Sequence, residues 1–224
     1  MTGRLRTQVL VITKAPVPGR SKTRLTPPCS PEQAAGIAAA AVADTLDAVR
    51  AAPVSRRVVA LDGEPGTLDL DGFTVVPQVE GDLGARLAAA FADAMSGTAP
   101  PTLLIGMDTP QVTPDLLVRC AERLEFGGPG TAVLGTAPDG GWWALGLHSA
   151  EAAAVLPDVP MSREDTAART REALEAAGLL VLDLPELTDI DHFPDALAVA
   201  EQCPPESRTA RVVASVAAAV GSRA

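Results

Sequence analysis

The sequence predicts an α/β protein with a mostly parallel β-sheet that helices cover on both faces. Short β-branched and apolar runs alternate with helical segments of about 12–20 residues, the order typical of such sheets. The chain has 224 residues, of which 47% are hydrophobic and 21% charged, and this is enough for a large core. Because no long linker or change of composition divides the chain, we expect a single domain over residues 1–224.

The first half of the chain contains four of the expected strands, each a short apolar run. They are 8–13, 57–61, 73–76 and 102–105. Residues 14–30 hold four prolines and Gly19, which predict an irregular loop. Ser30 and Pro31 form a helix cap with a first-turn proline, and residues 82–95 form a second helix.

The second half of the chain supplies the other expected elements. These are a helix from 113 to about 125, strands 131–136 and 143–147 around a turn at 138–141, a helix from a capping box at 162–165 to about 178, strand 179–184, and two closing helices rich in Ala and Val. In such sheets ligands bind beyond the carboxyl ends of the strands. We therefore expect the loops after Thr13, Ile105 and Thr136 to converge.

Charge is distributed unevenly along the chain, whose formal net charge is −10. The first acid is Glu32, and six cations precede it: Arg4, Arg6, Lys14, Arg20, Lys22 and Arg24. The remaining 12 cations and all 28 acids follow, so a segment of +6 precedes a body of −16. Lys14 and Lys22 are the only lysines of the chain, and two compact ammonium groups so close together support a site there.

Composition excludes several functional classes. An acidic chain with 3% aromatic residues and no Tyr lacks the surface that nucleic-acid binding needs. No apolar run approaches the roughly 18 residues required to span a membrane, and the run near the N-terminus is too short for a secretory signal. Three widely spaced cysteines predict buried or free thiols in a reducing cytoplasm. Neither His148 nor His192 has a triad pattern, and no dinucleotide-binding glycine motif follows the first strand.

The loop after the first strand is the strongest candidate site. Lys14, Arg20, Lys22 and Arg24 lie within eleven residues, on a segment that prolines stiffen. A di- or triphosphate requires several positive donors held in place, and Gly19 permits a close approach to the backbone. The spacing is not that of a Walker P-loop. We favour an anion site over the alternative of a solvated basic loop.

Carboxylates follow two later strands. Asp108, directly after strand 102–105, is placed to hold Mg²⁺ or Mn²⁺, with hydrogen bonding within its own turn as the alternative. Asp189 and Asp191 are both candidates to complete a metal site with Asp108. For Asp191, capping of the following helix is the alternative.

Two further segments are candidates for contact with an acceptor, and each has a structural alternative. Residues 138–143 combine paired glycines with two tryptophans, which a plain hairpin turn followed by core tryptophans also explains. Residues 78–86 end in Arg86, and the same segment is also typical of a helix start with Asp82 at the positive end of the dipole.

Taken in order, these motifs resemble those of a known group. They are Lys14-x-Pro-x-x-Gly-x-x-Lys-Thr-Arg-Leu25, Gly81-Asp-Leu-Gly-x-Arg86, Gly106-x-Asp-x-Pro110, Asp139-Gly-Gly141 and Asp189-x-Asp191. The group is a glycosyltransferase-like family of the nucleotide-diphospho-sugar transferase superfamily, of GT-A type. The first loop with the Ala-rich helix after it is also similar to 2-phospho-lactate guanylyltransferases. The resemblance extends from Val9 to about Ala198.

The resemblance implies a GT-A-like (Rossmann-like) three-layer α/β sandwich, with a divalent metal on Asp108. Gly106 reduces the Asp-x-Asp of many glycosyltransferases to one carboxylate, and Trp142 stands where the family usually shows Tyr. The remaining implied residues form two sets: Lys14, Pro16, Gly19, Lys22 and Arg24 for the nucleotide, and Arg86, Asp139, Gly140, Gly141 and Trp142 for the acceptor.

The favoured function is nucleotidyl transfer from a nucleoside triphosphate to a phosphorylated small molecule. Lys14, Lys22 and Asp108 are then the catalytic residues, with Mg²⁺ or Mn²⁺ on Asp108 and Asp191. Glycosyl transfer from a nucleotide sugar to a small acceptor, with Asp139 as base, is the alternative. A nucleotide-binding module without catalysis is the third hypothesis. An apolar stripe at 213, 216 and 220 packs either within the chain or in a homodimer.

Overall fold

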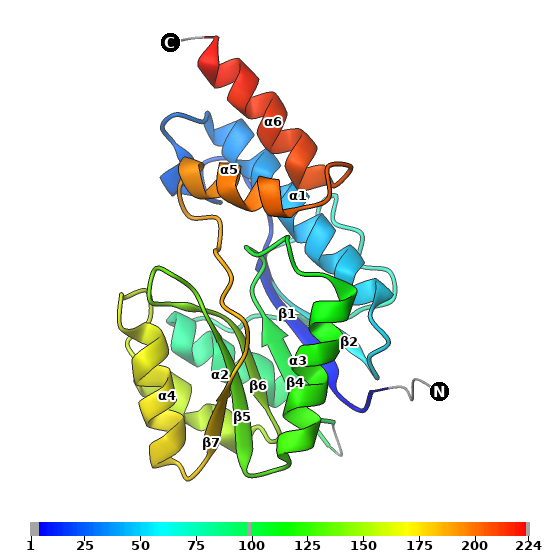
Figure 1. The fold of residues 1–224 in the computed structure, drawn as a ribbon, viewed down its shortest axis with the longest axis vertical. Helices are drawn as coiled ribbons and strands as arrows, with labels where there is room; N and C mark the ends of the chain where they lie inside the picture. The colour runs from blue at the N-terminus through cyan, green and yellow to red at the C-terminus, as the bar shows by residue number, and fades with distance from the viewer. Residues whose placement is uncertain (1–4, 98–99, 223–224) are drawn as a thin grey trace.

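The centre of the molecule is a seven-stranded sheet with the order β3-β2-β1-β4-β6-β5-β7 (Figure 1). The computed structural model describes residues 5–97 and 100–222. The strands are β1 (Gln8–Lys14), β2 (Arg57–Asp62), β3 (Thr74–Pro77), β4 (Thr102–Ile105), β5 (Thr131–Thr136), β6 (Trp142–Leu147) and β7 (Leu180–Asp183). Strand β6 is antiparallel to β4 and β5, and the other neighbouring pairs are parallel. The predicted mostly parallel α/β sheet is confirmed.

Helices form a layer on each face of the sheet. One face carries α1 (Pro31–Ala51) and α3 (Pro114–Gly127), and the other carries α2 (Leu83–Ala94), the 3₁₀ helix η2 (Glu151–Asp158) and α4 (Thr166–Ala176). Val9 and Val11 of β1 pack on the first face, whereas Leu10 between them packs on the second. This alternation buries both faces of a parallel strand, and for this reason the strand sequence is a continuous apolar run.

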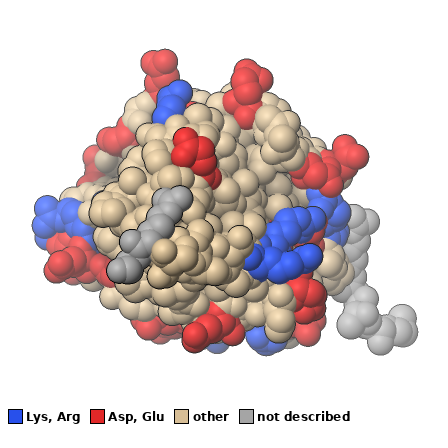
Figure 2. Space-filling model, turned by 90° about the horizontal axis from the view of Figure 1, so that it is seen from above, with Lys and Arg blue, Asp and Glu red and all other residues tan. Residues whose placement is uncertain are grey.

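A third hydrophobic cluster lies beyond one end of the sheet, where α5 (Phe193–Gln202) and α6 (Arg208–Gly221) pack beside α1 (Figure 1). It joins Leu25 of the first loop, Ile37 of α1 and Ile190 of the segment after β7. Val213 and Val216 are buried in this cluster, so the apolar stripe of α6 packs within the chain. The surface above these helices carries few charged side chains at its centre (Figure 2).

Three local features differ from the sequence-based expectations. The prediction of a capping box at 162–165 is wrong. Helix α4 begins at Thr166, and its N-cap residue Asp165 makes no side-chain cap hydrogen bond. The Asp165 carboxylate instead accepts hydrogen bonds from Arg163 (3.0 Å) and Arg169 (2.6 Å), because guanidinium donors are stronger partners than a backbone amide. Helix η2 and a short 3₁₀ turn, η1 (Thr23–Leu25), were not predicted, since neither is long enough to show a helical period.

Two other expectations concern features spread over the chain. All three cysteines are free and buried, as predicted. Among the helices of the described ranges, none combines the length and the apolar character that crossing a membrane requires.

The contact between α2 and η2 depends on the absence of a side chain at position 84. A Cβ atom on Gly84 would lie 2.4 Å from the Leu156 carbonyl oxygen, whereas one on Gly36 of α1 would meet nothing within 4 Å. We expect Gly84→Ala to lower the free energy of unfolding by about 2–3 kcal/mol through overpacking. Gly36→Ala is the matched control and should raise it by about 0.5–1 kcal/mol through helix propensity. Urea unfolding measures both changes, and equal values would contradict the packing at Gly84.

Candidate functional site

The carboxyl ends of β1, β4 and β5 lie at the same edge of the sheet, as parallel orientation requires. The segment after β7 crosses this edge and is tied to two of the loops. The backbone N–H of Leu187 donates to the Thr136 carbonyl (3.2 Å), and that of Ile190 donates to the Asp108 carbonyl (3.0 Å). The predicted convergence of the loops is therefore present, and the segment after β7 contributes to it.

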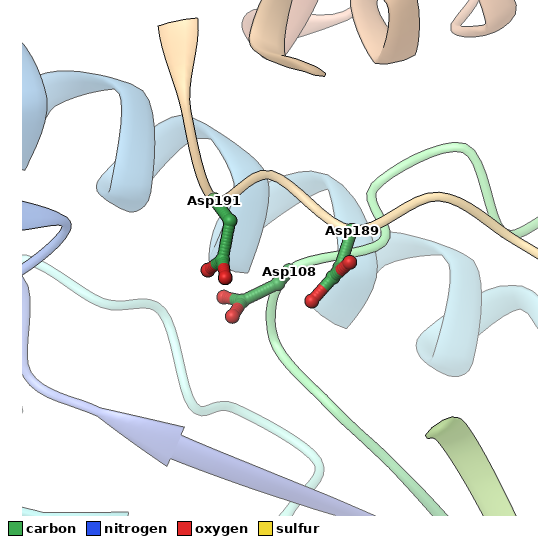
Figure 3. A group of neighbouring side chains, drawn as sticks. All are labelled: Asp108, Asp189 and Asp191. Atoms are coloured by element: carbon green, nitrogen blue, oxygen red, sulfur yellow. The ribbon is translucent and has the colours of Figure 1, made fainter. Parts of the chain in front are cut away.

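Three carboxylates meet at this edge. Asp108 follows β4, and Asp189 and Asp191 lie on the segment after β7, with their side chains pointing toward one another (Figure 3). One oxygen from each lies within 4.8 Å of the other two. Ile190, between two of the acids, is fully buried in the third hydrophobic cluster. The side-chain amide of Gln111 donates to the Thr188 carbonyl (2.7 Å), which further fixes this segment.

The basic loop faces the carboxylates across a cavity of about 250 Å³. The lining residues are Lys14, Arg20, Ser21, Lys22, Thr23, Arg24, Met107, Asp108 and Asp191. Ser21 holds the loop in shape, because its hydroxyl donates to the Ala15 carbonyl (3.1 Å) and accepts from the Val17 N–H (3.0 Å). Leu25 is fully buried and anchors the far end of the loop. The loop is therefore an ordered wall of the cavity.

Lys22 reaches from this wall into the acidic group. Its ammonium lies 2.7 Å from Asp108 Oδ2 and 3.7 Å from Asp191 Oδ1, and it also donates to the Ile190 carbonyl. Only 9% of the Lys22 side chain is exposed. Arg24 pairs with the other oxygen of Asp191 at 2.8 Å and is 62% exposed. Helix α5 has His192 as its N-cap residue, so Asp191 pairs with cations instead of capping that helix.

The donor set fits a hard divalent cation, which prefers carboxylate oxygens. Asp108 Oδ1 is buried and has no hydrogen-bond partner among the described residues, so one ligand oxygen is left without a donor. Burial raises the pKa of Asp189 to about 6, and the negative charges of Asp139 and Asp191 contribute to this rise. A cation at this position would satisfy the first oxygen and offset the repulsion that Asp189 experiences.

The other residues predicted for the nucleotide fall into two groups. Lys14 is the last residue of β1 and lines the cavity, and its ammonium makes no ion pair with any residue of the described ranges. Pro16 and Gly19 belong to the same loop but do not line the cavity, and Gly19 has a φ of +73°. Arg4, part of the basic N-terminal segment, lies outside the described residues.

The residues predicted for the acceptor make structural contacts. Arg86 donates to Asp62 Oδ2 and to Gln78 Oε1, both at 2.9 Å, and does not line the cavity. Trp142 donates from its indole N–H to Thr170 of α4 (3.1 Å). An acceptor role for Arg86 and Trp142 remains a prediction.

The glycine turn before β6 has a clear structural function. The Gly140 carbonyl accepts from the Ala167 N–H (2.8 Å), with φ at +86°. Asp139 accepts from the Gly141 N–H (2.8 Å), yet its charge still acts on Asp189. Of the residues predicted for the acceptor, Asp139 therefore has an electrostatic effect on the acidic group.

Sequence reasoning assigned no role to several residues that shape the site. Ser21, Thr23 and Met107 line the cavity, and Gln111 fixes the segment that carries two acids. Their residue types carry no chemical signature, and their positions become informative only in three dimensions. Asp189 was one of two candidates for a second metal ligand, and in the structure both candidates lie beside Asp108.

The fold is shared with several solved structures. A candidate nucleotide-diphospho-sugar transferase from Desulfovibrio desulfuricans G20 is 22% identical with a TM-score of 0.83, over 97% of this chain and 98% of that one. Rv0371c from Mycobacterium tuberculosis, in complex with manganese, is 21% identical with a TM-score of 0.52, over 89% and 100%. A 2-C-methyl-D-erythritol 4-phosphate cytidylyltransferase from Thermus thermophilus is 20% identical with a TM-score of 0.51, over 87% and 98%.

The chain belongs to the family described as "Uncharacterized protein conserved in bacteria (DUF2064)", whose profile matches residues 45–163, more than half of the chain. None of the curated proteins matches it.

The high pKa of Asp189 generates a prediction about stability. An acid with a pKa near 6 when folded and about 3.8 when unfolded stabilises the fold below pH 4, and this stabilisation is lost as the pH rises through 6. We therefore expect Asp189→Asn to raise the free energy of unfolding of the metal-free protein by roughly 1–2 kcal/mol at pH 8 and by little at pH 4. Chemical unfolding at both pH values in the presence of a chelator measures this difference.

The exposed Asp71 provides the control, since Asp71→Asn should leave the pH dependence unchanged. A loss of stability in Asp189→Asn that is larger at pH 8 than at pH 4 would show that the carboxylate is a stabilising partner instead.

Proposed function

We propose that this protein is a metal-dependent nucleotidyltransferase that transfers a nucleotidyl group from a nucleoside triphosphate to a phosphorylated small molecule. One observation carries the proposal: the four cations of residues 14–24 line a single cavity together with Asp108 and Asp191, and Asp189 lies beside these two acids. Such a cavity binds a polyphosphate and a divalent cation together, because the cations attract the phosphates and the carboxylates attract the metal.

The loop cations have distinct roles in this proposal. Lys14 has no ion-pair partner among the described residues and lines the cavity, so its ammonium is available to the terminal phosphates. Arg20 offers a guanidinium from the same wall. Cations carried by an ordered loop of this kind would stabilise the charge that develops on the departing pyrophosphate.

Asp108, Asp189 and Asp191 would hold the metal. Mg²⁺ or Mn²⁺ held by these carboxylates would supply positive charge that offsets the negative charge of the phosphates. In the transfer itself, an acceptor phosphate oxygen forms a bond to the α-phosphorus, and the bond from that phosphorus to the bridging oxygen of the β-phosphate breaks. Pyrophosphate leaves with the electron pair. The acceptor oxygen is already ionised, so no side chain has to remove a proton.

The comparisons support this chemistry at the level of the fold. A nucleotidyl transferase from Methanothermobacter and cytidylyltransferases share the arrangement of the elements, and a manganese complex is known for Rv0371c. We further propose a single-domain cytoplasmic enzyme, because nucleoside triphosphates and reduced thiols occur together in that compartment.

Glycosyl transfer is the second candidate, and the similarity to the Desulfovibrio protein, with a TM-score of 0.83, favours it. In this reaction the cavity would hold a nucleotide sugar, and the leaving group would be a nucleoside diphosphate. Asp139 is the candidate base for an acceptor hydroxyl, because its carboxylate is close enough to the acidic group for its charge to raise the pKa of Asp189.

The products of turnover distinguish the two candidates. The protein is incubated with Mg²⁺, a mixture of nucleoside triphosphates and a panel of sugar and small-acid phosphates. We expect release of inorganic pyrophosphate, detected by an assay coupled to inorganic pyrophosphatase. Release of a nucleoside diphosphate from nucleotide sugars, without pyrophosphate in the first assay, would establish glycosyl transfer instead.

The role of Asp108 is tested by replacing it with asparagine. Asp108→Asn preserves the shape of the side chain but removes one ligand charge, so kcat/KM should fall by about 100-fold or more. Asp93→Asn, an exposed change on α2, is the matched control and should keep full activity. Asp108→Asn with unchanged kcat/KM would remove the metal from the mechanism.

A further inference from the structure

Lys22 occupies the position that a divalent cation would need. Its ammonium contacts Asp108 Oδ2 at 2.7 Å and lies 3.7 Å from Asp191 Oδ1, the acids that would ligate the metal. The side chain is 9% exposed, so these contacts are shielded from water. In this arrangement the ammonium is engaged by Asp108, Asp191 and the Ile190 carbonyl.

A metal ion and this ammonium compete for the same acidic group. Mg²⁺ sits about 2.0–2.1 Å from its ligand oxygens and requires nearly ideal octahedral geometry. Asp108 Oδ1 is free to accept such an ion, but the ion would then share one carboxylate with the Lys22 ammonium on Oδ2, and the two positive charges repel each other. Departure of the ammonium therefore favours binding of the ion, and the affinity for the metal is lower in molecules in which Lys22 is in place.

The departure of Lys22 needs little rearrangement of the protein. Lysine carries its charge on a flexible four-carbon stem, so the ammonium moves by rotation of side-chain bonds. The surrounding backbone is fixed independently by the hydroxyl of Ser21 and by the buried Leu25. Lys22 also lines the same cavity as Lys14 and Arg20, so the released ammonium remains within reach of anything bound there.

We propose that Lys22 is an internal counter-ion of the acidic group, which a divalent cation displaces, and that the displaced ammonium then binds the phosphate groups of the ligand. The inference rests on the proposed function, in that Asp108, Asp189 and Asp191 are taken as the metal ligands. It adds that metal binding and phosphate binding are linked through one side chain, so that the phosphate site is completed only after the metal has entered.

The first test titrates Mn²⁺ alone into nucleotide-free wild-type protein, Lys22→Met and Lys14→Met, with calorimetry as the readout. Lys22→Met should bind Mn²⁺ about tenfold more tightly, because no ammonium has to leave. Lys14→Met also removes one positive charge from the cavity but breaks no described ion pair, so its affinity should stay within about threefold of the wild type. A Lys22→Met affinity equal to or weaker than the wild type, or an equal gain in both variants, would overturn the proposal.

The second test uses inorganic pyrophosphate at saturating Mg²⁺. Here Lys22→Met should bind about tenfold more weakly than the wild type, because a charged donor to phosphate is lost. Lys22→Met should therefore bind Mn²⁺ more tightly and pyrophosphate more weakly than the wild type, and this combination is what the proposal requires. Unchanged pyrophosphate affinity would overturn the transfer of Lys22 to the phosphates.

A measurement on the wild type covers the case in which Lys22→Met does not fold. The chain has two lysines, so [¹⁵N]lysine labelling gives two assignable ammonium signals. Mg²⁺ should move the Lys22 signal toward that of a hydrated lysine and shift Lys14 less. An unchanged Lys22 signal at saturating Mg²⁺ would overturn the exchange. None of these measurements involves turnover, so absence of nucleotidyl transfer with the exchange intact would overturn the proposed function alone.

Discussion

Mutual repulsion of three carboxylates is the constraint on which the rest of this site depends. Oxygens of Asp108, Asp189 and Asp191 lie within 4.8 Å of one another in a partly buried place, where like charges interact strongly. The fold tolerates this because Lys22 and Arg24 reach the acids from the first loop. The pKa of Asp189 is raised first by burial and then by the negative charges of Asp139 and Asp191. The basic loop and the acidic group therefore stabilise each other.

The parallel sheet makes this meeting possible at low cost in loop length. Strands β1 and β4 are adjacent and parallel, so Lys14 and Asp108 emerge at one edge although 94 residues separate them. Strand β6 is antiparallel to both β4 and β5, so these two strands run in the same direction. Strand β7 is parallel to β5, and the segment after β7 therefore starts at the same edge. Backbone hydrogen bonds from this segment to Asp108 and Thr136 then fix two further acids. Topology sets the site, and the side chains adapt to it.

Most of the fold and part of the site follow from patterns in the sequence. Apolar runs located all seven strands within a few residues, and the charge imbalance before Glu32 identified the loop that lines the cavity. Side-chain partners were harder to foresee. Arg86 is engaged by Asp62 of β2 and by Gln78 of the loop before α2, so its position in a motif does not reveal its contacts. The orientation of Lys22 toward acids rather than open space depends on Asp108 and Asp191, far away in the chain.

Ile190 connects the chemistry of the cavity to a distant part of the molecule. It is fully buried among residues of α1, α5 and α6, and an acid lies on either side of it. The positions of Asp189 and Asp191 therefore depend on how the buried Ile190 side chain packs against α5 and α6. Substitutions that loosen the packing of α6 would move Ile190, and with it the two acids, without changing any residue that lines the cavity. The closing helices, which contribute no residue to the lining of the cavity, therefore help to hold two of its acids in position.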